Sequence, residues 1–275
     1  MGGGEVKRMK GMEKELCKCG DGGLAVPLAK HAREKLNCLN RYLNTFNTGM
    51  KNLWENRVYI DLLSGPGKCI IDGKEQDGSL LVAYRCNNPF THYFINDINP
   101  KCIESLRIRI GNDLKVKFLN LDCNQAIEEI LNQLPPYFLG FCFIDPYNCE
   151  IEFESIKKLT EGRRIDLMIT FHLGNMRRGL LAEKLKKFFP PETDLETLRR
   201  EACSGSRING DMIMQAYIKG LNSIEYKHTE ISPGIRNSTG VVLYHLVFAS
   251  KHPLGQKFFS ISTQKLESGQ LKFSW

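Results

Sequence analysis

The stretch RVYIDLLSGPG, residues 57–67, constrains the fold of this chain more than any other. Its first part is rich in aliphatic and aromatic residues, which is typical of a buried strand. It ends in Ser64-Gly65-Pro66-Gly67, where glycines let the backbone turn tightly and lie against a ligand. A strand that meets such a loop is the usual start of a nucleotide-type site in a doubly wound α/β sheet. Because a carboxylate inside an apolar run is costly, we interpret Asp61 as part of a cofactor site.

The rest of the chain repeats this alternation of strand, turn and helix. Hydrophobic patterns predict strands at residues 57–63, 92–96, 115–120, 138–144 and 164–171. They predict helices at 27–46, 79–86, 99–110, 124–134 and 153–160, and a loop at 70–78. This alternation predicts an α/β fold with a parallel sheet covered on both faces. Residues 224–231 and 241–250 read as a closing antiparallel hairpin.

Composition limits the number of domains and the cellular environment. The length of 275 residues fits a single domain from residue 26 to residue 275, with a helical insertion at about 175–223. Residues 1–25 are rich in Gly, Lys and Glu, and we expect a flexible N-terminus. Ten cysteines without a secreted-domain framework favour free thiols in the cytoplasm over a zinc site, so we expect no metal. No apolar run is long enough to span a bilayer.

Acidic residues fall in or just beyond four successive predicted strands. They are Asp61, Asp97, Asp122 and Asp145. Ligands of open α/β sheets bind outside the carboxyl ends of the strands, where carboxylates can accept hydrogen bonds from ribose or amino groups. Any one of these acids alone reads more readily as a helix N-cap. The occurrence of all of them after successive strands, together with the glycine loop, favours a ligand site.

The glycine loop excludes several ligand classes. Residues 65–70 lack the third glycine of a dinucleotide loop, and Gly67-Lys68-Cys69 lacks the hydroxyl of a P-loop. An acid in the strand before the loop, an acid after the next strand and D-P-aromatic after the fourth strand resemble the Rossmann-like S-adenosylmethionine-dependent methyltransferases. The resemblance implies the cofactor S-adenosyl-L-methionine. It implies that the methionine end of the cofactor contacts Asp61 and the loop residues Ser64, Gly65, Pro66 and Gly67. It also implies that the ribose contacts Asp97 and the adjacent Ile98, and that the adenine contacts Asp122 and Cys123.

Three segments are similar to the three-Cys-motif partner protein family. They are residues 59–67, residues 144–147 and the late segment 246–255, and the helix expected before the first strand fits the same family. The resemblance spans most of residues 30–260. The family name refers to cysteines of a partner, so it implies a partner protein and gives no role to the cysteines of this chain.

The motif Asp145-Pro146-Tyr147 supplies the candidate catalytic residues. Methyltransferases that act on exocyclic amines of bases use related motifs, in which the acid orients the amine and the aromatic ring stacks on the base. The form with a single proline is similar to that of tRNA guanine-N2 dimethyltransferases. The plainer interpretation is a strand-to-helix turn in which Asp145 caps the helix.

These observations predict a methyltransferase that acts on an exocyclic amine of DNA or RNA. The net charge of +7 fits a polyanionic partner or a plain basic surface. Basic pairs such as Arg163-Arg164, Arg177-Arg178 and Lys251-His252 suit phosphate contacts or a solvated surface equally well. The alternative is a non-catalytic binding module that recruits a partner enzyme or nucleic acid. We expect no association with a membrane.

Overall fold

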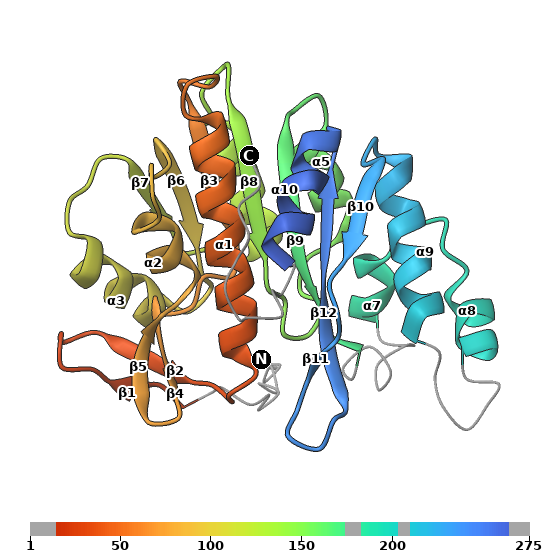
Figure 1. Cartoon of the computed structure of the whole chain (residues 1–275), viewed down its shortest axis with the longest axis horizontal. Coiled ribbons are helices and arrows are strands. Elements are labelled where there is room, and N and C mark those ends of the chain that lie inside the picture. Colours follow the sequence, from red (N-terminus) through yellow and green to blue (C-terminus); the bar gives the residue numbers. More distant parts are fainter. Residues whose placement is uncertain (1–14, 174–182, 203–209, 264–275) are drawn as a thin grey trace, which may run out of the picture.

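A twisted sheet runs through the centre of the molecule (Figure 1). The computed structural model describes residues 15–173, 183–202 and 210–263. Within these residues the sheet has eight strands. They are β3 (Arg57–Asp61), β6 (His92–Asn96), β7 (Val116–Leu119), β8 (Leu139–Ile144), β9 (Ile165–Phe171), β10 (His228–Ile231), β11 (Ile235–Arg236) and β12 (Val242–Ser250). The predicted strands and the closing hairpin are confirmed, with ends shifted by a few residues.

The strand order is β10-β12-β9-β8-β3-β6-β7, and β11 pairs with β12. Strands β7, β6, β3, β8 and β9 pair in parallel, whereas β12 is antiparallel to both β9 and β10. The chain proceeds from β3 outward through β6 to β7, and then returns to the other side of β3 at β8. The boundary between β3 and β8 is therefore a topological switch point, where open α/β sheets bind their ligands at the carboxyl ends of the strands.

Helices cover both faces of the sheet, as the alternation predicted. One face packs against α1 (Ala32–Met50), α2 (Ser79–Tyr84), α3 (Pro100–Ile110) and α10 (Pro253–Thr263). The other face packs against α4 (Cys123–Leu131), α5 (Phe153–Thr160), α7 (Glu183–Phe188), α8 (Leu195–Ala202) and α9 (Gly210–Ser223). Successive strand residues point to opposite faces of the sheet. In β3, Val58 and Ile60 therefore pack in the core on the α4 and α5 side, and Tyr59 packs in the core on the α1 side.

The same alternation decides which site residues face α1. In β8, Phe141 and Phe143 belong to the core on the α1 side. Asp145 lies two residues further on, just past the end of the strand, and contacts Lys35 of α1. Tyr59 sets the same direction for Asp61 in β3. Both carboxylates therefore point toward the face that α1 and α2 cover.

A second, four-stranded sheet was not predicted. It consists of β1 (Cys17–Lys18), β2 (Leu24–Pro27), β4 (Lys68–Ile71) and β5 (Lys74–Asp77). The prediction of a loop at 70–78 was wrong, because Asp72 and Gly73 both have positive φ and close a two-residue hairpin between Ile71 and Lys74. Residues 1–25 were expected to be flexible; strands β1 and β2 of this sheet begin within them, and residues 1–14 lie outside the described residues.

The predicted helix at 27–46 begins later, at Ala32, because the backbone at Pro27 and Leu28 pairs with β4. Within the predicted insertion, residues 183–188, 195–202 and 210–223 are helical, whereas 174–182 and 203–209 lie outside the described residues. Helix α10 was not predicted. No helix among the described residues is long and apolar enough to cross a membrane.

Candidate functional site

The carboxyl ends of the central strands bring the predicted acids to one edge of the sheet. Asp61 is the last residue of β3, and Asp97 and Asp145 directly follow β6 and β8. Asp122 lies after β7 and caps α4, its side chain accepting a hydrogen bond from the backbone N–H of Asn124 at 2.9 Å. For Asp122 the N-cap interpretation is therefore correct, and its second oxygen is the part that can still serve a ligand.

The glycine loop turns back over this edge. Gly65 and Gly67 have φ of +63° and +91°, which side chains rarely adopt. The Gly65 N–H donates to Asp97 Oδ2 at 2.8 Å, and the Ser64 N–H donates to the Asn96 carbonyl at 3.0 Å. No described atom lies within 4 Å of where a Cβ would stand at Gly65. The loop is thus held to the end of β6 while Gly65 faces open space.

Asn96 connects the ends of β3, β6 and β7 by hydrogen bonds. It is fully buried, and its Nδ2 donates to the carbonyls of Leu62 and Leu121, both at 3.0 Å. Its Oδ1 accepts the Leu121 N–H at 3.1 Å. Because all the polar groups of this amide are satisfied, it fixes the chain after β3 against the chain after β7. The sequence showed this residue only as the polar end of a strand.

Asp61 does not face open space in this structure. Its side chain is fully buried and accepts hydrogen bonds from the Tyr59 hydroxyl at 3.1 Å and the Leu63 N–H at 3.3 Å. Burial raises the pKa of Asp61 to about 7, against the opposing effect of hydrogen bonds from Ser79, Leu63 and Tyr59. Asp61 therefore holds the turn after β3, and any effect on a ligand passes through that turn.

Arg109 of α3 anchors the glycine loop through its guanidinium group. Its guanidinium donates to the carbonyl of Pro66 in the loop and to the carbonyl of Leu24 in β2, and it pairs with Asp21 at 2.9 Å. The arginine side chain is only 3% exposed. Asp21 also pairs with Lys68 of β4, and Arg109 and Lys68 together hold the pKa of Asp21 well below its usual range. The small sheet and the glycine loop therefore share one anchor.

We expect Arg109→Ala to destabilise the protein by about 2–3 kcal/mol, because two carbonyls and one carboxylate lose their donor in a largely buried place. Denaturant unfolding measures this loss, and hydrogen exchange at Gly65 should accelerate. The control is Arg107→Ala on the same helix, where the exposed guanidinium lies 5.0 Å from the Phe118 ring centroid. That variant should lose about 0.5–1 kcal/mol. Equal losses in the two variants would contradict an anchoring role.

Ile98 and Cys123 occupy different environments. Ile98, next to Asp97, is 67% exposed, which is unusual for an aliphatic side chain of this size. Cys123 begins α4 and is only 3% exposed, so its thiol belongs to the core. Burial raises the pKa of Cys123 to about 12. Of these two predicted residues, Ile98 offers an apolar surface to a ligand, while Cys123 offers its backbone.

Asp145 lies at the centre of a cluster that the sequence analysis did not foresee. The Lys35 ammonium of α1 donates to Asp145 Oδ2, and His172 Nε2 lies 3.8 Å from Oδ1. Oδ1 is inaccessible to solvent and has no hydrogen-bond partner among the described residues. Burial acts to raise the pKa of Asp145, but the charge of Lys35 and the contact with His172 outweigh it, so the net pKa lies well below the usual range.

Aromatic side chains surround this carboxylate. Tyr147 is 40% exposed, and its ring centroid lies 6.5 Å from that of His172. The His172 ring lies 5.0 Å from Tyr244 of β12, and Lys35 Nζ lies 5.7 Å from the centroid of the same tyrosine. Acid, cation and rings together form a polar cluster bordered by aromatic side chains, which suits a planar group that carries hydrogen-bond donors.

The basic pairs singled out in the sequence do not border this cluster. Arg163 and Arg164 precede β9, so they lie at the opposite edge of the sheet. Lys251 follows the antiparallel strand β12, which brings it to that same opposite edge, where it pairs with Glu225 at 2.9 Å. Arg177 and Arg178 lie outside the described residues. No group of three or more metal-ligating side chains occurs within the described ranges.

The strand order, the switch point and the glycine loop define a Rossmann-like α/β fold. No protein-family model matches the chain, and no curated protein matches it. Protein LPL1258 from Legionella pneumophila str. Philadelphia 1, of the family DUF519, is similar over 81% of this chain and 89% of its own, at 12% identity and a TM-score of 0.54. This similarity shows the fold.

More distant similarities are to two methyltransferase structures. The CurJ carbon methyltransferase is similar over 77% of this chain and 54% of its own, at 12% identity and a TM-score of 0.47. Trm1 from Pyrococcus horikoshii, solved with S-adenosyl-L-methionine, is similar over 83% of this chain and 58% of its own, at 12% identity and a TM-score of 0.44.

Proposed function

We propose that this protein is an S-adenosylmethionine-dependent methyltransferase that acts on an exocyclic amine of nucleic acid. The observation that carries the proposal is the position of Asp145-Pro146-Tyr147 directly after β8, next to the glycine loop after β3 and across the switch point from it. Adjacent strand ends are about 5 Å apart, so a cofactor lying on the loop can reach a group held by Asp145.

The residues at the strand ends fit the cofactor. Open space in front of Gly65 leaves room for its methionine end, and a side chain at this position would fill that space. Each oxygen of Asp97 accepts one backbone N–H, from Gly65 and from Asn99, both at 2.8 Å. The Cys102 thiol also hydrogen-bonds this carboxylate, and the lone pairs that remain serve the ribose hydroxyls. The exposed Ile98 then packs on the sugar or base, and Asp122 and Cys123 border the adenine.

When bound, the cofactor supplies an electrophilic methyl group. The accessible part of the Asp145 side chain, which is 26% exposed, accepts one hydrogen of the target amine, and this directs the nitrogen lone pair away from the carboxylate. Lys35 holds Oδ2 and keeps Asp145 ionised, so this carboxylate acts as an orienting acceptor. His172 Nε2, 3.8 Å from Oδ1, helps to keep the carboxylate ionised, and the methylated amine releases its proton to solvent. The exposed Tyr147 ring stacks on the base.

Further predictions accompany this proposal. The resemblance to the three-Cys-motif partner family, and the partner protein it implies, remain predictions. The nine described cysteines are all free thiols, which supports a reducing compartment such as the cytoplasm. The alternative function, a non-catalytic module that recruits a partner, would be favoured by cofactor binding without methyl transfer to RNA, DNA or protein.

Calorimetric titration with S-adenosylhomocysteine tests the cofactor site. We expect binding by the wild-type protein, and Gly65→Arg should weaken it about a hundredfold or more because the arginine fills the cradle. Asp97→Ala should weaken it about tenfold, since the ribose and the Gly65 N–H both lose an acceptor. The matched control is Gly162→Arg, because Gly162 also has a positive φ, +66°, and open space, but lies in the turn before β9 at the opposite edge.

The control should bind like the wild-type protein. No heat from the wild-type protein at millimolar ligand would refute the cofactor site, and so would a Gly65→Arg variant that binds normally.

A further inference from the structure

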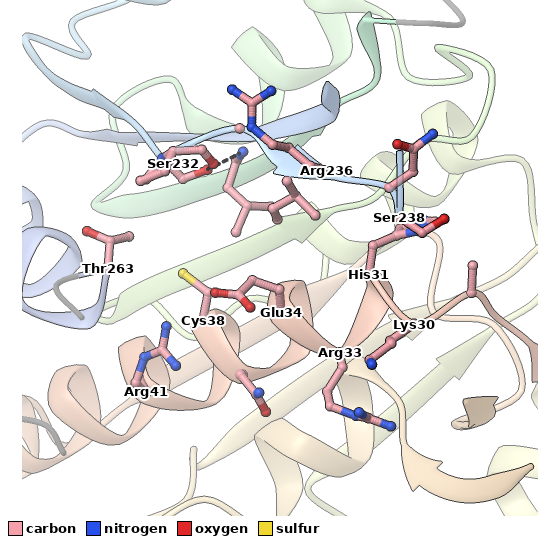
Figure 2. A pocket seen from close by; sticks show the side chains of 17 residues that line it. Lys30, His31, Arg33, Glu34, Cys38, Arg41, Ser232, Arg236, Ser238 and Thr263 are labelled. Atoms are coloured by element: carbon pink, nitrogen blue, oxygen red, sulfur yellow. Dashed lines mark hydrogen bonds between the residues drawn. The ribbon is translucent and has the colours of Figure 1, made fainter. Parts of the chain in front are cut away.

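A cavity of about 930 Å³ lies beside the acceptor cluster, between the first half of α1 and the segment 232–238 that contains β11 (Figure 2). Figure 2 shows α1 along one wall, with side chains from Lys30 to Arg41, and Arg236 on the strand of the facing wall. The volume is at the upper end of the range for small-molecule pockets. Nothing in the proposed cofactor site uses this cavity.

The described lining of the cavity is basic. It contains four cationic residues, Lys30, Arg33, Arg41 and Arg236, and one carboxylate, Glu34. Arg41 donates to the Ser262 carbonyl at 2.6 Å and Arg236 to the Gly240 carbonyl at 2.7 Å. Backbone carbonyls orient these guanidinium groups without neutralising them. Their remaining N–H groups can therefore bind an anion, and the arginine fork matches a phosphate.

Arg33 pairs with Asp72 at 3.1 Å, and that pair is half-exposed. Exposed ion pairs contribute little, so a phosphate can compete with Asp72 for Arg33. The basic side chains run from Lys30, just before α1, to Arg41 within it, and the helical part from residue 32 to residue 41 is about 14 Å long. That length accommodates several consecutive phosphates of one strand.

The cavity adjoins the acceptor cluster through two side chains. His31 lines the cavity, and its ring lies edge-on to Tyr244 at 5.8 Å between centroids. Tyr244 also donates its hydroxyl to the His31 carbonyl at 3.1 Å, and its other neighbours are His172 and Lys35 of the acceptor cluster. A chain held in the cavity can therefore place one unit on the Asp145 side of this aromatic wall.

We infer that this cavity binds the phosphodiester backbone of a single nucleic-acid strand next to an extruded target base. The inference rests on the function proposed above for the position of that base. Enzymes that modify a base act on single strands or extrude the base from a duplex, because the target atom is otherwise inaccessible. The cavity gives the flanking backbone a basic channel, and Asp145 with Tyr147 receives the base. A polyglutamate peptide meets the charge, but its side chains carry no planar amine for the acceptor cluster.

Binding of a short labelled oligonucleotide, measured by fluorescence anisotropy at several salt concentrations, tests this inference. The variant is Lys30→Glu with Arg236→Glu, and the matched control is Lys219→Glu, an exposed lysine on α9. We expect the double variant to lose affinity roughly tenfold or more at low salt. The slope of log K against log salt should become shallower by about 1.4, the value for two lost contacts with a single strand. The control should retain both values.

Titration of the same variants with S-adenosylhomocysteine separates the two proposals. If the double variant loses oligonucleotide binding but keeps cofactor binding, the result supports nucleic-acid binding in the cavity. If the double variant keeps oligonucleotide binding, that role of the cavity is overturned and the cofactor site is unaffected. If oligonucleotide binding depends on the cavity but the protein does not bind the cofactor, the role of the cavity is supported and the methyltransferase proposal is refuted. A polyglutamate peptide that binds more tightly than the oligonucleotide, with the same dependence on the variant, overturns the assignment to nucleic acid.

Discussion

Replacement of Asp145 by alanine should lower the rate of methyl transfer by about 10²–10⁴-fold while S-adenosylhomocysteine binds nearly as well as before. In the proposed site the carboxylate contacts the acceptor, whereas the proposed cofactor contacts belong to the glycine loop and Asp97. The Asp145 side chain is 26% exposed, so an amine can reach the carboxylate although Oδ1 itself is closed to solvent. Label transferred from radioactive cofactor to total RNA, DNA and protein measures the rate.

Asp145→Asn and Glu129→Ala complete this experiment. Asparagine keeps an acceptor oxygen but loses the charge that pairs with Lys35, so we expect an intermediate rate. Glu129 is an exposed acid on α4, and its replacement should leave the rate unchanged. A normal rate in Asp145→Ala would refute the acceptor role. A protein that binds the cofactor but labels no fraction, with or without the substitution, would favour the non-catalytic binding module.

Much of this fold could be predicted because each strand of a parallel sheet is visible in the sequence as a short apolar run. Apolar runs such as residues 138–144 end in polar residues, and those ends must meet at one edge when the strands are parallel. Asp97 and Asp145 were found for that reason. The β4–β5 hairpin also had a local signal, the Asp72-Gly73 pair of a tight hairpin turn. It was missed because β5 is polar and charged, and so lacks the apolar residues by which the other strands were recognised.

The partners of these residues could not be predicted with the same ease. Lys35 and Asp145 are 110 positions apart, and only the packing of α1 on the sheet brings them together. A signal did exist, since Lys35 lies on the same helical face as Leu39, Tyr42 and Phe46, where a lysine is out of place. His172 also followed a strand end, where only acids had been considered. Tyr244, in the middle of a strand, gave no signal.

A pH-dependent loss of stability should come from Asp61. Its pKa rises from an ordinary value of 3.8 to about 7, with burial as the main cause. Below pH 3.8 the folded and unfolded states are both protonated, so the group costs nothing. As the pH rises, the unfolded chain ionises first while the folded protein keeps its proton, so stability falls until the pH passes about 7. The loss amounts to roughly 4 kcal/mol across this window.

Asp61→Asn isolates this effect, because the amide is uncharged at every pH and has nearly the same shape. The difference in unfolding free energy between Asp61→Asn and wild type should therefore rise by roughly 4 kcal/mol from pH 4 to pH 8. Asp166 is a second buried acid on the same face, held by the Tyr42 hydroxyl at 2.7 Å, and burial raises its pKa to about 6. The matching curve for Asp166→Asn should level off near pH 6 instead of pH 7. A flat difference for Asp61→Asn would mean that Asp61 is ionised in the folded protein, and that the turn after β3 holds a charge.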